Sequence, residues 1–168
     1  MVVIVEGIDR VGKTTLCNKL KDTFGGVIAK GVCYHTFDSN EETHKAFGEV
    51  LVNVAAMLNI WPEDKLLILD RFHLSHFTYG CLERGMVDFS SKLVDDMLAN
   101  SKVLLILVRP TDIAFSSEKH GKDLSNHARL FELLINHTKL PIITTDYDSL
   151  DTCIENVTRY MQNDYKCI

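Results

Sequence analysis

The sequence predicts an α/β protein in which a five-stranded parallel sheet lies between two layers of helices. Two observations predict it: short apolar runs rich in β-branched residues recur along the chain, and stretches with helical periodicity separate them. Right-handed crossovers through these helices would make the strands parallel and cover both faces of the sheet. A chain of 168 residues can bury one full core, so we expect residues 1–168 to form a single domain.

The expected strands are apolar runs that stop where polar residues begin. They are Val2–Glu6, Leu66–Asp70, Val103–Val108 and Ile142–Thr144, with a shorter fifth strand near Val27–Ala29. Uninterrupted apolar runs of this kind are typical of strands that are buried on both faces. Such sheets bind ligands beyond the carboxyl ends of their strands. Asp70, Arg71 and Arg109, which stand at strand ends, are therefore candidate site residues.

Helical patterns fill the intervals between the strands. They cover Lys13–Phe24, roughly Glu41–Leu58, Ser75–Arg84, Ser90–Asn100, Ser125–Asn136 and Leu150–Gln162. A polar segment at about 115–123 lies between a strand and a helix, and it contains lysine but no arginine. We interpret this segment as a lid that closes over a bound phosphate donor and excludes water. A plain solvated loop is the alternative.

Residues 7–14 read Gly-Ile-Asp-Arg-Val-Gly-Lys-Thr. They match the pattern G-x-x-x-x-G-K-[ST] between an expected strand and an expected helix, which is the context of a phosphate-binding P-loop. Backbone N–H groups and the N-terminus of the helix would attract the phosphates. We therefore predict a P-loop NTPase fold that binds ATP. The expected contacts are Gly7, Ile8, Asp9, Arg10, Val11, Gly12, Lys13, Thr14 and Thr15.

Three side chains are the predicted catalytic groups. Lys13 would contact the β- and γ-phosphates. Asp70 would hold Mg²⁺ together with the Thr14 hydroxyl, so Mg²⁺ is an expected cofactor. Arg10, which lies inside the loop, would offset charge on the transferring phosphoryl group. Next to Asp70, Arg71 would bind an acceptor phosphate, because a planar guanidinium pairs with two phosphate oxygens.

Two segments carry a resemblance to a known family. Residues 6–15, Glu-Gly-Ile-Asp-Arg-Val-Gly-Lys-Thr-Thr, are similar to the P-loop of the thymidylate kinase family. Asp70-Arg71-Phe72, followed by Ser75 and Tyr79, resembles that family's Asp-Arg-Tyr segment. The resemblance implies a homodimeric kinase that phosphorylates a deoxynucleoside monophosphate with ATP as the donor. Arg10 matches the subgroup that carries its catalytic arginine in the P-loop rather than in the lid.

The resemblance also implies roles on the acceptor side. Asp9 would bond the 3′-hydroxyl of the acceptor sugar, Arg71 would hold its phosphate, and Tyr79 would block the ribose 2′ position. The remaining acceptor residues implied by the resemblance are Ser75 and His35, with His35 in place of an arginine that usually touches the phosphate.

The chain departs from the family where the base is read. The family usually contacts thymine with a phenylalanine and an arginine on the helix before the Asp-Arg strand, and the aligned positions here hold Ala56 and Ile60. We expect a pyrimidine deoxynucleotide as acceptor, such as dTMP, dUMP or a modified pyrimidine nucleotide, with acceptance of several deoxynucleotides as the alternative. The aromatic candidates for stacking on the base, each of which could instead pack in the core, are Phe37, Phe72, His73 and His76.

A deoxynucleoside kinase is the main alternative. It would need a carboxylate base to deprotonate a neutral hydroxyl, and Asp38 or Asp70 could serve. A GTP-dependent switch would carry Asn-Lys-x-Asp, but the nearest match, at residues 18–22, has the wrong spacing. A scaffold that binds nucleotide without turnover is disfavoured by the intact catalytic residues. His73 and His76 lack further ligands at the usual spacing of a zinc site.

Composition limits the partners. A net charge of −5 gives no general attraction to a polyanion, so we expect a small nucleotide substrate and no nucleic acid. No apolar run has the length that spans a membrane, and no secretory leader precedes the first strand, so no membrane contact is expected. Five cysteines without a C-x-x-C pair argue against a disulfide framework and favour a reducing cytoplasm.

Overall fold

The computed structural model describes residues 1–31, 41–87, 90–113, 117–118 and 121–164. Within these ranges it has one sheet of five parallel strands, in the spatial order β2-β3-β1-β4-β5. The strands are β1 (Val2–Glu6), β2 (Val27–Lys30), β3 (Leu67–Asp70), β4 (Val103–Arg109) and β5 (Ile142–Asp146). The predicted parallel sheet is confirmed, including the short strand after the first helix.

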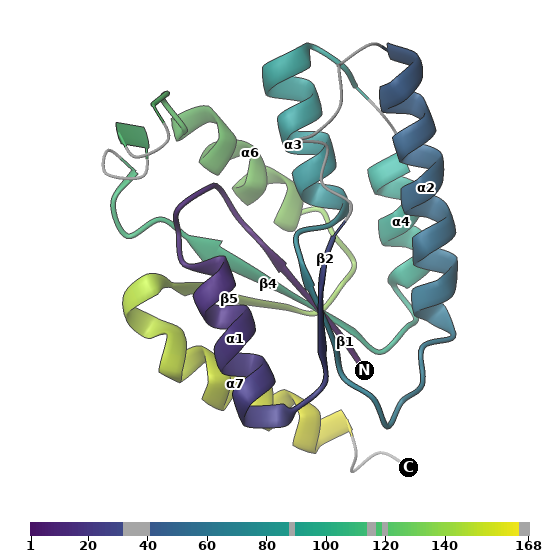
Figure 1. The fold of residues 1–168 in the computed structure, drawn as a ribbon, viewed down its shortest axis with the longest axis vertical. Coiled ribbons are helices and arrows are strands. Elements are labelled where there is room, and N and C mark those ends of the chain that lie inside the picture. The colour runs from purple at the N-terminus through teal and green to yellow at the C-terminus, as the bar shows by residue number, and fades with distance from the viewer. Residues whose placement is uncertain (32–40, 88–89, 114–116, 119–120, 165–168) are drawn as a thin grey trace.

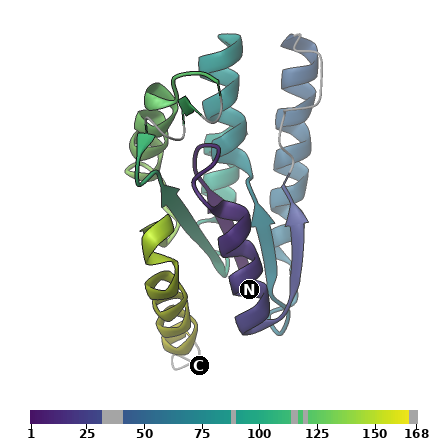
Figure 2. The same ribbon diagram turned by 60° about the vertical axis from the view of Figure 1, so that its left-hand side comes forward.

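Helices cover both faces of this sheet, as Figures 1 and 2 show. Two of them, α1 (Lys13–Phe24) and α7 (Leu150–Asp164), lie side by side, and Lys19 bonds Asp151 between them at 2.5 Å. The opposite face carries α2 (Glu41–Asn59), α3 (His73–Arg84), α4 (Ser90–Leu98) and α6 (Ser125–Ile135). The three-layer α/β/α arrangement is therefore confirmed.

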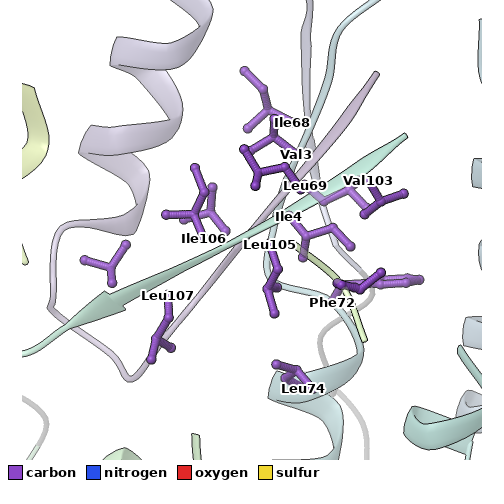
Figure 3. Close-up of a cluster of buried hydrophobic side chains, with 14 of the residues drawn as sticks. Val3, Ile4, Ile68, Leu69, Phe72, Leu74, Val103, Leu105, Ile106 and Leu107 are labelled. Carbon is purple, nitrogen blue, oxygen red and sulfur yellow. The ribbon is translucent and has the colours of Figure 1, made fainter. Parts of the chain in front are cut away.

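The central strand β1 is buried along its whole length. It pairs with β3 on one side and with β4 on the other, so that Ile4 lies opposite Leu69. Figure 3 shows these side chains in one apolar cluster with Phe72 and Leu74, which enter it from the start of α3. The cluster holds the carboxyl ends of β1 and β3 next to each other, and both ends lead into candidate site residues.

Helix α3 begins at His73, two residues earlier than the pattern predicted. The reason is a carboxylate at the end of strand β1. Glu6, the last residue of β1, accepts hydrogen bonds from the backbone N–H groups of Phe72 at 2.8 Å and Ser75 at 3.2 Å. These are donors that the first turn of a helix cannot satisfy internally. A tertiary contact, invisible to local periodicity, therefore sets the start of this helix.

The segments that follow β4 and β5 also differ from expectation. β5 continues to Asp146 and leads into a 3₁₀ turn, η1 (Tyr147–Ser149), which the sequence pattern did not indicate. Residues 115–116 and 119–120 of the expected lid lie outside the described residues. In the described part of the chain, no helix is long and apolar enough to cross a membrane.

Candidate active site

The P-loop runs from the end of β1 to the start of α1 and depends on two glycines. Gly7 has φ +139° and Gly12 has φ +93°, values that residues with side chains rarely adopt. A Cβ atom on Gly7 would lie 2.3 Å from the carbonyl oxygen of Val108, and one on Gly12 would lie 2.5 Å from the ring of Tyr147. The loop can therefore pack against β4 and η1 only with glycine at these two positions.

Lys13, the first residue of α1, is almost fully buried beneath the loop. Its ammonium group donates a hydrogen bond to the carbonyl oxygen of Ile8. Burial is the main cause that lowers the pKa of Lys13 to about 7, and the positive charge of Arg71 lowers it further. The carboxylates of Asp9, Asp70 and Glu6 act in the opposite direction. The buried cation is thus poised for a ligand that brings negative charge, as phosphates do.

Thr14 and Asp70 form the pair of oxygen donors that the sequence assigned to Mg²⁺. The Thr14 hydroxyl donates a hydrogen bond to Asp70 at 3.2 Å, which joins the start of α1 to the end of β3. Hydroxyl and carboxylate oxygens suit Mg²⁺, which usually keeps several waters and takes further ligands from substrate phosphates. Among the described residues no cluster of three or more His, Cys, Asp or Glu could hold a metal by itself. The donor set therefore fits a metal that is shared with a nucleotide.

Arg71 is buried, with its guanidinium directed across the sheet edge to the P-loop. Nη1 donates to the carbonyl oxygen of Gly7 at 3.2 Å and to the hydroxyl of Ser75 at 3.1 Å, and Nη2 pairs with the carboxylate of Asp9. Its guanidinium carbon also lies 5.2 Å from the centre of the Tyr79 ring. The backbone of Arg71 has φ +74°, an unusual value for a residue with a side chain. Several contacts thus hold a strained residue in one position.

A cavity of about 460 Å³ joins these groups. Its lining is Asp9, Arg10, Gly12, Lys13, Thr14, Thr15, Asp70, Arg71 and Tyr147. The fold therefore brings together all three predicted catalytic residues, both predicted metal ligands and two of the predicted acceptor residues. Arg10 is exposed at the loop tip with φ +66°. In contrast to the buried Arg71, Arg10 is exposed while it contributes to the cavity lining.

Other predicted site residues lie behind the cavity wall or elsewhere. Ser75 and Tyr79 are buried on α3 and contact Arg71, so they line the site from behind this arginine. His35 and Phe37 lie outside the described residues, as does Asp38. Arg109 is not in the cavity lining; it forms two bonds of 2.6 and 2.7 Å to Glu132 on α6.

Of the four aromatic candidates for base stacking, three lie within the described residues, and all three are buried. Phe72 is fully buried in the apolar cluster of Figure 3. His73 is buried as well, 3.4 Å from the carboxylate of Asp95 on α4. The ring of His76 stacks on that of His44 with centres 4.4 Å apart. These three side chains pack within the protein, in keeping with the core alternative.

Sequence reasoning missed two residues of the site. Tyr147 was missed because the expected end of β5 fell before it, although it follows a strand end like the other candidates. Glu6 lies inside the quoted P-loop resemblance but had no role there. Its full burial is the informative property, since a lone carboxylate is rarely buried without partners.

No protein-family model matches the chain. A thymidylate kinase of Xylella fastidiosa (strain M12) is 31% identical over 102 residues, which are 59% of this chain and 45% of that protein. The match thus spans less than half the length of that relative.

Solved structures resemble the chain over nearly its whole length. The YorR protein of Bacillus subtilis, solved in complex with phosphorylated GDP, superposes with a TM-score of 0.72 at 18% identity and covers 100% of this chain and 99% of its own. For thymidylate kinase from Ehrlichia chaffeensis the TM-score is 0.62 at 18% identity, with 96% and 98% covered. Deoxyadenosine kinase from M. mycoides, with products dCMP and dCDP, gives 0.56 at 15%, with 97% and 99% covered.

The fold is therefore that of P-loop nucleotide kinases. The chain resembles thymidylate kinase in sequence over 102 residues and in fold over 96% of its length.

Proposed function

We propose that this protein is an ATP-dependent, Mg²⁺-requiring kinase that phosphorylates a deoxynucleoside monophosphate to the diphosphate. One observation carries the proposal: the buried Arg71 and the P-loop Lys13 line the same cavity. An arginine fork suits an acceptor phosphate, and the P-loop lysine suits the donor. Two phosphate-binding cations in one cavity are what transfer between two phosphorylated substrates requires.

The reaction needs little covalent chemistry from the protein. An oxygen of the acceptor 5′-phosphate attacks the γ-phosphorus of ATP, a P–O bond forms, and the bond to the β–γ bridging oxygen breaks, so that ADP leaves with the electron pair. Lys13 holds the donor phosphates, Arg71 and Asp9 hold the acceptor, and Arg10 offsets charge on the moving group. When bound, Mg²⁺ at Thr14 and Asp70 would neutralise charge on the donor phosphates. Tyr147 offers an aromatic face beside Gly12 for the donor base.

We propose a pyrimidine deoxynucleotide such as dTMP, dUMP or a modified pyrimidine nucleotide as the acceptor. The similarity to thymidylate kinase supports this choice. The alternative, a deoxynucleoside kinase, has support from the shared fold of deoxyadenosine kinase. It requires a carboxylate base, for which Asp38 and Asp70 are the candidates. Of these, Asp70 lies within the described residues, and it already accepts a hydrogen bond from Thr14. Homodimer formation and a cytoplasmic location are further proposals; exposed apolar side chains on α2, such as Met57, would suit helix pairing.

A screen of nucleosides and 5′-monophosphates, in both ribo and deoxy forms, tests the proposal by ADP release. We expect turnover with deoxynucleoside monophosphates and none with nucleosides. Turnover with nucleosides alone would establish the alternative. Absence of turnover across the panel, with ATP bound, would contradict both kinase assignments.

Tyr79 is proposed to exclude the ribose 2′-hydroxyl, and a Tyr79→Ala variant tests this role. The expected result is that UMP becomes a substrate beside dUMP. Since Tyr79 is buried against Arg71, the change should also lower the free energy of unfolding by about 3 kcal/mol. The measured quantity is therefore the ratio of kcat/KM for UMP and dUMP, which does not depend on the folded fraction. An unchanged ratio would remove Tyr79 from sugar selection.

A further inference from the structure

Glu6 is a fully buried carboxylate at the carboxyl end of β1, directly before the P-loop. It accepts three hydrogen bonds. Two come from the backbone N–H groups of Phe72 and Ser75, at 2.8 and 3.2 Å, and the third comes from the hydroxyl of Ser75. All three donors belong to the turn and first helical residues that follow Arg71.

The direction of these bonds determines what Ser75 can offer to Arg71. A serine hydroxyl has one proton, and here that proton is donated to Glu6. The lone pairs of the same oxygen therefore remain to accept the bond from Arg71 Nη1, at 3.1 Å. A guanidinium has only donors, so Ser75 can bond it only while its own proton points elsewhere.

The backbone of Arg71 depends on the same carboxylate. Its left-handed conformation, φ +74°, persists only where neighbouring contacts enforce it. Arg71 N–H bonds the carbonyl oxygen of Val5 at 2.9 Å, and the next N–H, that of Phe72, bonds Glu6. The residues before and at the start of the P-loop thus hold both the backbone and the side chain of the proposed acceptor-binding arginine.

We propose that Glu6 is a positioning residue for acceptor binding, which acts on Arg71 through the hydroxyl of Ser75. This inference rests on the proposed function for the role of Arg71. Glu6 itself is fully buried and does not line the cavity, so its carboxylate would act on the acceptor only through other residues. Its carboxylate orients the Ser75 hydroxyl, and the oriented hydroxyl fixes the guanidinium at the cavity wall.

A Glu6→Gln variant tests this role with almost no change in shape. The amide oxygen can still accept from Phe72 and Ser75 N–H, so the start of α3 is kept. The amide NH₂ group, however, donates to the Ser75 oxygen and turns the hydroxyl proton toward Arg71. With dTMP as the probe, we expect its KM to rise about 10- to 100-fold. Because the charge of Glu6 also raises the pKa of Lys13, its loss should weaken ATP binding at alkaline pH, so KM for dTMP is measured at saturating ATP.

The direction of the change separates this role from a purely electrostatic one. Removal of a negative charge near the site would by itself strengthen binding of an anion. Tighter dTMP binding in Glu6→Gln would therefore overturn the proposal. A matched control is Glu132→Gln, the same substitution in a carboxylate that pairs with an arginine outside the cavity. This control should leave both KM values unchanged.

Ser75→Ala provides the decisive comparison and covers the case in which Glu6→Gln does not fold. It should raise KM for dTMP on its own, and in the Ser75→Ala background the Glu6→Gln change should have no further effect on this KM. A wild-type KM in Ser75→Ala, or full additivity of the two changes, would overturn the proposal.

A direct measurement keeps the result independent of the acceptor. In ¹⁵N-labelled protein, the guanidinium of Arg71 should give distinct, slowly rotating NMR signals, assigned with Arg71→Lys, and Glu6→Gln should abolish them. If the original protein does not bind dTMP but the signals are lost in Glu6→Gln, the proposed acceptor is wrong, while the positioning of Arg71 by Glu6 through Ser75 is supported. Retention of the signals in Glu6→Gln would overturn the proposal that Glu6 positions Arg71.

Discussion

The P-loop and the turn between β3 and α3 each place an arginine at the same cavity, but they hold it differently. Both residues have left-handed backbone, with φ +66° at Arg10 and +74° at Arg71. Such a conformation costs about 1–3 kcal/mol and is tolerated where the surrounding structure enforces it. Arg71 is buried, and its guanidinium bonds the carbonyl oxygen of Gly7, the hydroxyl of Ser75 and the carboxylate of Asp9. Arg10 is exposed at the loop tip.

This difference indicates a division of work. A guanidinium that is held in place before the substrate arrives can contribute to binding of the ground state at little cost in side-chain order. A side chain exposed at the rim can approach the transferring group when charge develops there, and such a contact raises kcat rather than affinity. The comparison thus predicts that loss of Arg10 affects mainly kcat and that loss of Arg71 affects mainly the acceptor KM.

The largest effect is expected for Arg10→Ala. If Arg10 contacts the phosphoryl group only in the transition state, kcat should fall about 10³-fold while KM for dTMP stays nearly the same. Steady-state kinetics at saturating ATP measures both values. A kcat like that of the original protein would remove Arg10 from the mechanism and with it half of the comparison.

Arg71→Lys should have the next largest effect. A lysine keeps the charge but cannot replace the forked donor set that reaches Gly7, Ser75 and Asp9. We expect KM for dTMP to rise about 100-fold, with kcat at saturating dTMP within about threefold of the original value. The opposite pattern, a lower kcat at an unchanged KM, would mean that Arg71 rather than Arg10 meets the transferring group.

Lys13 provides a pH test of the donor side. Its pKa of about 7 leaves it largely neutral in the free protein above that pH, and bound phosphates favour its charged form. ATP binding should therefore take up a proton, and affinity should fall as pH rises, by about eightfold between pH 7.5 and 8.5. Calorimetry of Mg-ATP binding in buffers of different ionisation enthalpy measures the uptake.

The matched variant for this test is Lys13→Arg. An arginine does not titrate in this range, so the pH slope attributed to Lys13 should disappear even though binding is weaker. A slope that persists in Lys13→Arg would assign the titration to another group. Arg71 cannot contribute to this slope, which keeps the two sides of the cavity distinguishable.

The donor side of the site was predictable from sequence because its information is local. Eight consecutive residues, with a strand before and a helix after them, define the P-loop, and Lys13 and Thr14 begin α1 and line the cavity. The strand-end rule likewise selected Asp70 and Arg71, which line the same cavity. In contrast, the start of α3 depends on Glu6, whose carboxylate accepts a hydrogen bond from the N–H group of Phe72. The two residues are 66 positions apart in the sequence. No periodicity or propensity reports a contact of that separation.

The base-reading side was less predictable for a related reason. Aromatic residues near the Asp-Arg segment suit either a core or a stacked ligand, and their sequence positions do not distinguish the two. Burial decides it for Phe72, which packs with Ile4 and Leu74 in the apolar cluster. The strand-end rule also overcounted, since Arg109 satisfies it but points to α6.

Arg109 accordingly gives the smallest expected effect and sets the lower limit of the comparison. It is the last residue of β4, whereas Arg71 directly follows β3, and it also pairs with a carboxylate, but both Arg109 and Glu132 are well exposed to solvent. An exposed ion pair contributes about 0.5 kcal/mol to stability, which salt screens further. Arg109→Ala should therefore leave both KM values and kcat unchanged and lower the free energy of unfolding by no more than that amount, as denaturant titration can measure. A large kinetic effect would mean that α6, which also contacts α3, transmits changes to the acceptor side, so that burial at the cavity would no longer be sufficient to explain why Arg71 matters.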